Sequence, residues 1–208
     1  MILFLTLLSG VAWTIVYIEA IRKGFKDKTY AMPLFALGLN IAWEAIYAIT
    51  GLSNPTIQTP VNFIWCALDV VIVVTYFLYG RKEFPDNAKK YFIPYSILAF
   101  ATNFAIQIAF YLHFSRSEAA SYSAFLQNAA MSILFLTMLF QRQSKKGQSV
   151  LLAVAKWIGT LAPVISFGIL NEFNIFVLIT GIICSIFDII YIVALVKWDS
   201  IKAPVKTS

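Results

Sequence analysis

Seven long apolar stretches, separated by short polar segments, account for almost the whole chain. Each is close to the ~20 residues that an α-helix needs to cross the ~30 Å hydrocarbon core of a bilayer. We therefore predict an all-α fold, an integral membrane bundle of seven transmembrane helices, with residues 1–208 forming a single transmembrane domain. The predicted helices cover residues 2–21, 31–50, 60–80, 91–113, 120–141, 149–170 and 173–197.

The composition agrees with a bilayer environment. The chain is 60% hydrophobic and only 12% charged, whereas a soluble domain carries about 25% charged residues. The mean hydropathy is +0.79. Both cysteines, Cys66 and Cys184, lie inside apolar stretches, which favours free thiols packed as small hydrophobic side chains over a disulfide or a metal site.

Positive charges are concentrated in alternate connecting segments. Fourteen of the sixteen Lys and Arg residues follow the first, third, fifth and seventh helices, and the segments between hold only Arg116. We place the remaining one, Lys156, near an end of the sixth helix. By the positive-inside rule the N-terminus is outside and the C-terminus cytoplasmic. We expect a multi-pass protein of the cytoplasmic membrane in a prokaryote or of the endoplasmic reticulum in a eukaryote, with membrane lipids rather than nucleic acid as partners.

Three acidic residues, Glu44, Asp69 and Asp188, lie deep in apolar stretches. An ionised carboxyl at a helix centre costs about 2.5–3.5 kcal/mol on insertion scales, so each requires an explanation. With a rise of ~1.5 Å per residue, they lie roughly 16, 18 and 14 Å from the cytoplasmic boundary. The sequence thus predicts all three at about the same level, near the middle of the bilayer. Glu19 lies near the basic residues that follow the first helix, where we expect an interfacial ion pair.

Helical spacing places further polar and aromatic residues on the same faces as these acids, and such faces turn away from lipid. They either join helices through hydrogen bonds or line a functional cavity. Three acids at one level, with no basic residue there to pair them, favour the cavity. A carboxyl group kept neutral in such an apolar chamber is a potential proton donor. The flanking residues are Asn40, Trp43 and Tyr47 in the second helix, Asn62, Trp65 and Tyr76 in the third, Asn103 and Gln107 in the fourth, Gln127 and Asn128 in the fifth, and Tyr191 in the seventh.

Two short motifs resemble the small integral-membrane terpene cyclases of meroterpenoid and indole-diterpene pathways. They are Asn40-Ile-Ala-Trp43-Glu44-Ala-Ile-Tyr47 in the second helix and Asp188-Ile-Ile-Tyr191 in the last. Chain length, helix count and the near absence of soluble loops are similar too. The resemblance implies that Glu44 and Asp188 are the catalytic acids. Asp69 is added to the predicted site because of its depth in the membrane alone, and not because of the resemblance.

The resemblance also implies a chemistry. Such enzymes protonate an epoxide or alkene of a lipophilic prenylated substrate, and the carbocation then cyclises in an aromatic-lined cavity, in a reaction of the isomerase or lyase type. Ionising a prenyl diphosphate instead would require clustered carboxylates that hold Mg²⁺, and no aspartate-rich run is present; we expect no metal and no cofactor. The expected substrate-binding residues are Asn40, Trp43, Tyr47, Asn62, Trp65, Asp69, Asn103, Gln107 and Tyr191.

Two other classes of seven-helix protein fit parts of the pattern. Mid-membrane carboxyls also serve proton relays, so a small sugar or proton-coupled transporter is the alternative function. A retinal protein needs a lysine in the middle of the last helix. Lys197 lies at the end of that helix and position 188 is an aspartate, which argues against a photoreceptor.

Overall fold

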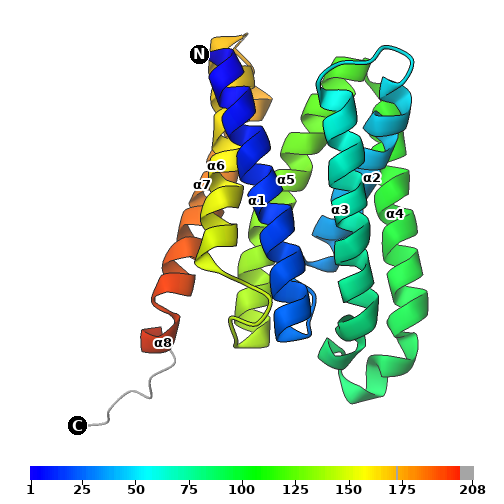
Figure 1. Ribbon diagram of the computed structural model, residues 1–208, viewed down its shortest axis with the longest axis vertical. Coiled ribbons are helices and arrows are strands. Elements are labelled where there is room, and N and C mark those ends of the chain that lie inside the picture. Colours follow the sequence, from blue (N-terminus) through cyan, green and yellow to red (C-terminus); the bar gives the residue numbers. More distant parts are fainter. Residues whose placement is uncertain (172, 202–208) are drawn as a thin grey trace.

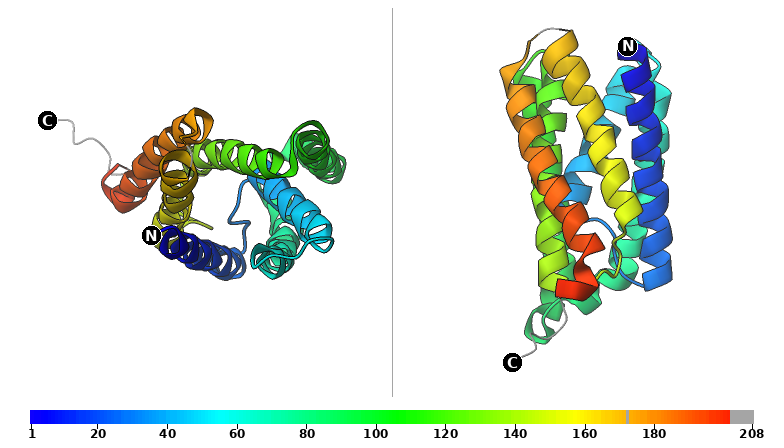
Figure 2. Two further views of the ribbon diagram at one scale, coloured as in Figure 1. Left: turned by 90° about the horizontal axis from the view of Figure 1, so that it is seen from above. Right: turned by 90° about the vertical axis from the view of Figure 1, so that its left-hand side faces the viewer.

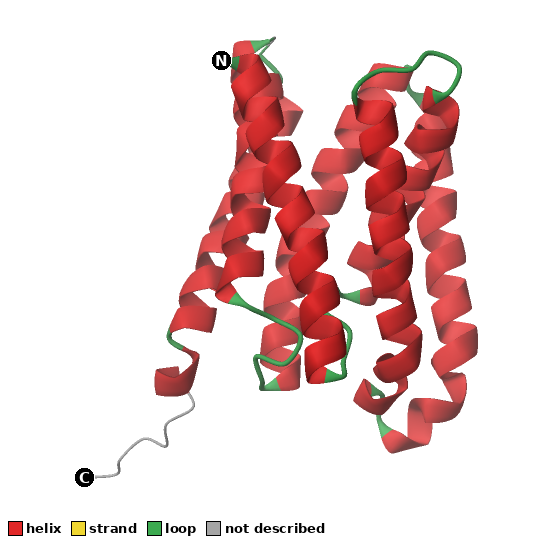
Figure 3. Ribbon diagram, viewed as in Figure 1, coloured by secondary structure: helices red, strands yellow, loops and turns green. Residues whose placement is uncertain are grey.

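The computed structural model describes residues 1–171 and 173–201, and within these residues it is helical, without strands (Figures 1 and 3). Seven of the helical segments are long and apolar enough to cross a membrane, which confirms the predicted seven-helix architecture. The long helices are α1 (Ile2–Asp27), α2 (Leu34–Gly51), α3 (Gln58–Tyr79), α4 (Phe92–His113), α5 (Arg116–Arg142), α6 (Val150–Ile165) and α7 (Ile175–Val196), followed by the short α8 (Trp198–Ile201).

The helix ends differ from the predicted bounds where polar residues continue a helix beyond its apolar part. α1 extends to Asp27 and ends where Lys28 adopts the left-handed conformation, with φ 50° and ψ 50°. α5 begins at Arg116, because Ser115 and Glu118 form a capping box that satisfies its first backbone N–H groups. α6 contains Pro163 and continues into a π-helical turn, Ser166–Leu170.

Six of the long helices form a ring when the molecule is seen along their axes (Figure 2, left). Around the ring the order is α1, α3, α2, α5, α7 and α6, and each helix packs against the next. α4 lies outside this ring, against α2 and α5. Residues from six different helices can therefore meet in the interior.

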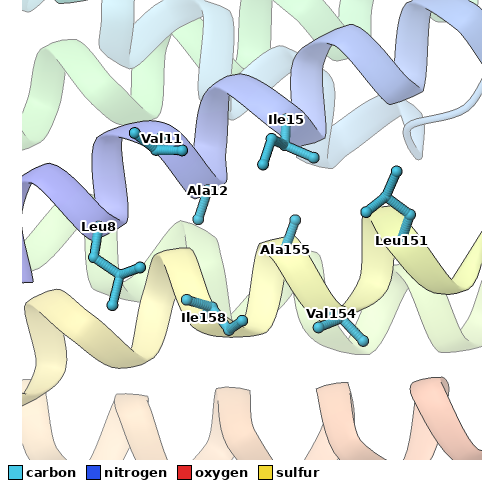
Figure 4. Close-up of a pocket in the computed structure, with 8 residues that line it drawn as sticks. All are labelled: Leu8, Val11, Ala12, Ile15, Leu151, Val154, Ala155 and Ile158. Atoms are coloured by element: carbon cyan, nitrogen blue, oxygen red, sulfur yellow. The ribbon is translucent and has the colours of Figure 1, made fainter.

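The outward faces of all seven long helices carry exposed large hydrophobic side chains, as expected for surfaces that contact lipid. Between α1 and α6 this surface has an apolar groove of ≈ 180 Å³ (Figure 4). It is lined by Leu8, Val11, Ala12, Ile15, Leu151, Val154, Ala155 and Ile158.

The connection between α1 and α2, residues 28–33, crosses the interior of the ring rather than its rim (Figure 2, left). The guanidinium of Arg142 lies 4.1 Å from the centre of the Tyr30 ring, and its Nη1 donates to the Tyr30 carbonyl at 2.9 Å. The Thr29 hydroxyl donates to Glu83 at 2.8 Å. These contacts hold the connection across one end of the ring and cover the interior there.

The basic connecting segments lie at that same end. The α1–α2, α3–α4 and α5–α6 connections and α8 are together at the bottom of Figure 1, and the N-terminus is at the top. Glu19 forms the expected ion pair there, at 2.6 Å from Arg22 Nε. Glu172, Lys202 and Lys206 lie outside the described residues.

Candidate functional site

Two of the three predicted acids meet inside the ring. The amide nitrogen of Asn40, on α2, lies 3.1 Å from Glu44 Oε1, 2.9 Å from Asp69 Oδ2 on α3, and 2.6 Å from the Tyr17 hydroxyl on α1. The Tyr17 hydroxyl donates to Glu44 Oε1, and the two carboxyl groups are adjacent. We call Tyr17, Asn40, Glu44 and Asp69 the carboxyl cluster; all four side chains are buried.

The carboxyl cluster is held without a cation. Among the described residues, the hydrogen-bonding and charged neighbours of Glu44 and Asp69 include no Lys or Arg. The two carboxyl groups hydrogen-bond to each other. Such a bond needs a proton on one of them, because an ionised carboxylate only accepts.

A chain of amides fixes the orientation of Asn40. The side-chain amide of Gln127, on α5, donates to Asn40 Oδ1 at 3.3 Å, and that of Gln107, on α4, donates to Gln127 Oε1 at 2.7 Å. Because its oxygen accepts this bond, the amide nitrogen of Asn40 faces the acids. Gln107, a predicted substrate-binding residue, thus contacts the cluster through Gln127.

Two tryptophan rings pack against Tyr17 of the carboxyl cluster. Tyr17 stacks on Trp65 with ring centres 5.9 Å apart, and the ring centre of Trp13 lies 6.3 Å from that of Tyr17. The Trp65 indole donates to Thr14 at 3.2 Å, which fixes its orientation. We call Trp13, Tyr17 and Trp65 the aromatic row.

The structure places the other predicted binding residues further from the two acids. Trp43 packs on Tyr47 with ring centres 4.8 Å apart, and its indole donates to the Ala120 carbonyl. Two of the remaining three form hydrogen bonds elsewhere: Asn62 accepts from Gln58 at 2.8 Å, and the Tyr191 hydroxyl donates to Gln148 at 3.0 Å. The Asn103 side chain packs against Gly38 at the α2–α4 contact, and neither of its polar atoms has a hydrogen-bond partner among the described residues.

The third acid, Asp188, forms a second buried group with a cation. Lys156 Nζ on α6 lies 2.8 and 2.9 Å from the two carboxyl oxygens of Asp188 on α7, and 2.6 Å from Ser132 Oγ on α5. We call Ser132, Lys156 and Asp188 the lysine cluster; each is 0% exposed. The expectation that no basic residue pairs the mid-membrane acids is therefore wrong for Asp188. Lys156 is a buried partner rather than a helix-end residue.

Sequence reasoning missed Tyr17 and Trp13 as well as Lys156. A single tyrosine in an apolar stretch is ordinary, although Trp13 and Tyr17 share a helix face at i, i+4 spacing. Lys156 lies seven residues into α6 and thirty-two residues before Asp188. The signal that it carried was a lone charge inside an apolar stretch, the same signal that identified the acids.

Among the residues that the structure describes, no three His, Cys, Asp or Glu side chains form a group that could hold a metal ion. Cys66 and Cys184 are free thiols, as predicted. The carboxyl cluster contains one amide, one phenol and two carboxyls, groups that can donate and relay a proton.

A family model described as Pyr4-like transmembrane terpene cyclases matches residues 1–200. The chain belongs to this family. Membership confirms the resemblance inferred from the motifs around Glu44 and Asp188, and with it a multi-pass membrane protein.

Curated members of the Pyr4-like family align over much of the chain. The Pyr4-family terpene cyclase mfmH of Annulohypoxylon moriforme is 29% identical over 162 residues, which are 76% of this chain and 66% of the relative. The terpene cyclase andB of Emericella variicolor is 28% identical, over 80% of this chain and 71% of the relative. The terpene cyclase pyr4 of Aspergillus fumigatus is 25% identical, over 74% of this chain and 65% of the relative.

The alignments thus span about two thirds of the length of these relatives. No solved structure matches the chain.

Proposed function

We propose that this protein is a membrane-embedded terpene cyclase that protonates an epoxide or alkene of a prenyl-chain substrate and guides the resulting carbocation to a cyclic product. The observation that carries the proposal is the carboxyl cluster, in which two acids without a cationic partner meet in the interior of the ring. Family membership supports the reaction class.

The cluster offers a proton for the first step. Two adjacent carboxyls in a low-dielectric site do not both ionise, because their like charges repel; one retains its proton. We assign the donor role to Glu44, whose ionised form is stabilised by the bonds from Tyr17 and Asn40 once the proton has left. With an epoxide, the proton goes to the ring oxygen, the C–O bond breaks, and the neighbouring alkene attacks the cationic carbon.

The aromatic row can stabilise the carbocation that forms next. A carbocation is attracted to the faces of Trp and Tyr rings, and Trp13, Tyr17 and Trp65 follow one another beside the donor. The last cation loses a proton to a base, so the product has the mass of the substrate. Asp188 is the second proposed catalytic carboxyl.

Glu44→Gln provides the direct test. The amide keeps the size of the side chain but has no acidic proton, and general acid catalysis contributes about 10²–10⁴-fold. In purified protein, incubated with prenyl substrates that end in an epoxide or an alkene, we expect cyclisation to fall by about that factor. Chromatography with mass spectrometry detects the cyclic isomer.

Asp86→Asn is the matched control, because the Asp86 side chain is 95% exposed in the α3–α4 connection and pairs with Lys89. It should cyclise at the unsubstituted rate. Full activity of Glu44→Gln would refute the assignment. An inactive unsubstituted protein that instead moves sugars or protons across proteoliposomes would establish the transporter alternative.

A further inference from the structure

The ammonium of Lys156 is fully satisfied inside the membrane. It has three hydrogens and three acceptors, the two oxygens of Asp188 and the hydroxyl oxygen of Ser132. The Ser132 hydroxyl donates its own proton to the Asn128 carbonyl at 2.9 Å, so it can only accept from Lys156. This arrangement fits a charged lysine and an ionised aspartate, and no proton of it is free for a substrate.

The two clusters therefore differ in the charge that surrounds their carboxyl groups. Glu44 and Asp69 are adjacent acids without a cation, whereas Asp188 accepts from an ammonium at both of its oxygens. A carboxylate in that situation is ionised at rest and has no proton with which to start the reaction. It can still accept a proton from a carbocation, because a carbocation is a far stronger acid than a carboxylic acid.

Two sets of contacts connect the clusters. On α5, Gln127 bonds to Asn40 of the carboxyl cluster and Ser132 belongs to the lysine cluster; the two positions are five residues apart, or about 7.5 Å along the helix axis. The aromatic row makes the second connection. Tyr17 bonds to Glu44, and Trp13 lies so close to Gly159 that a Cβ there would be 2.9 Å from the indole. Gly159 lies one helical turn beyond Lys156.

We propose that Lys156 holds Asp188 ionised, so that Asp188 receives the proton that ends the cyclisation cascade and does not start it. The inference rests on the proposed cyclase function and deepens it. In the last step a C–H bond next to the terminal cation breaks, its electron pair forms the alkene, and the proton passes to an Asp188 oxygen. Lys156 is then a positioning residue that acts through Asp188, and Glu44 remains the donor.

The ionisation state can be tested without substrate. In infrared spectra of the purified, lipid-reconstituted protein, a protonated carboxyl gives a C=O stretch that an ionised one lacks. We expect this band in the unsubstituted protein, its loss in the double variant Glu44→Gln/Asp69→Asn, and no change in Asp188→Asn. In Lys156→Met a second band of this type should appear, and Lys156→Arg should restore the original spectrum. Loss of the original band in Asp188→Asn would overturn the inference.

The distribution of products tests whether Asp188 receives the final proton. In a Lys156→Met/Asp188→Asn double variant no unpaired charge remains buried, so folding is less at risk than in either single variant. We expect it to consume substrate but to reduce the share of the normal alkene by about tenfold or more, in favour of water-quenched alcohols or isomeric alkenes.

The same products at the same rate from the folded double variant would show that the pair only stabilises the fold. Complete loss of substrate consumption, with Glu44→Gln still active, would make Asp188 the donor. If the unsubstituted protein cyclises no prenyl substrate, the proposed function fails, while the infrared result still decides the charge state of Asp188.

Discussion

The side-chain amide of Asn40 joins residues of three helices through a single nitrogen and orients both acids of the carboxyl cluster. Its two hydrogens are shared among Tyr17, Glu44 and Asp69, so these contacts depend on one another. The phenol of Tyr17 has a separate role, because it donates directly to the acid that we propose as donor.

Tyr17→Phe isolates that hydroxyl. The ring, and with it the stacking on Trp65, is retained, but Glu44 loses a hydrogen bond that stabilises its ionised form. Bonds to charged groups contribute about 1.5–3 kcal/mol. We therefore expect kcat to fall by about 10–100-fold, with KM nearly unchanged, in steady-state assays of cyclisation.

Thr14→Val is the matched control, because it removes the hydroxyl that accepts from Trp65 and leaves Tyr17 bonded to Glu44. Its kcat should exceed that of Tyr17→Phe by a wide margin. Equal losses in both variants would mean that ring placement, and not the bond to Glu44, is what Tyr17 provides.

The sequence predicted that three acids lie buried in the membrane-spanning helices, as they do, but it did not predict their partners. Insertion cost and depth identified Glu44, Asp69 and Asp188 and predicted a common level. Depth contains no information on which helix faces which, so the sequence could not separate the pair Glu44–Asp69 from Asp188. It also could not place Lys156 beside Asp188, because that contact depends on the packing of α6 on α7.

The packing of α6 on α7 depends on small residues at their contact. A Cβ on Gly181 of α7 would lie 2.4 and 2.5 Å from the two methyl carbons of Val164 on α6, well inside van der Waals contact. This close approach of the two backbones lies on the helices that carry Lys156 and Asp188.

Gly181→Ala is therefore expected to destabilise the protein by about 1–3 kcal/mol, the usual cost of overpacking. Thermal unfolding in detergent should show a lower midpoint. The double variant Gly181→Ala/Val164→Ala, in which the space is returned, should recover part of the loss. An unchanged midpoint in the single variant would show that the two helices separate at little cost.

Helix existence was predictable and helix ends were less so. Apolar stretches of sufficient length fixed all seven spans, but hydropathy falls before a helix stops, and so the polar last turns of α1 and the capped first turn of α5 were assigned to loops. The capping box at Ser115 and Glu118 was readable in the sequence as a Ser and a Glu at the required spacing.

The molecule as a whole has one basic end and one end with little charge. The basic connections lie at the end covered by residues 28–33, and the N-terminus lies at the other. By the positive-inside rule we propose that the basic end faces the cytoplasm.

Single cysteines test this orientation in a background without Cys66 and Cys184. In intact cells, a membrane-impermeant maleimide should label Asn54→Cys, in the α2–α3 connection, and should label Ser144→Cys, in the α5–α6 connection, only after the cells are opened. The reverse pattern would contradict the proposed orientation and place the basic end outside.

The lysine cluster also bears on how the chain enters the bilayer. Alone, α6 would carry an unpaired ammonium and α7 an unpaired carboxylate, each costing about 2.5–3.5 kcal/mol on insertion scales. The two helices are consecutive in the chain, so the ion pair can form as soon as both have been synthesised. We expect α6 and α7 to leave the translocon together as a hairpin, and ribosomes stalled before α7 is complete to hold α6 at the membrane entrance.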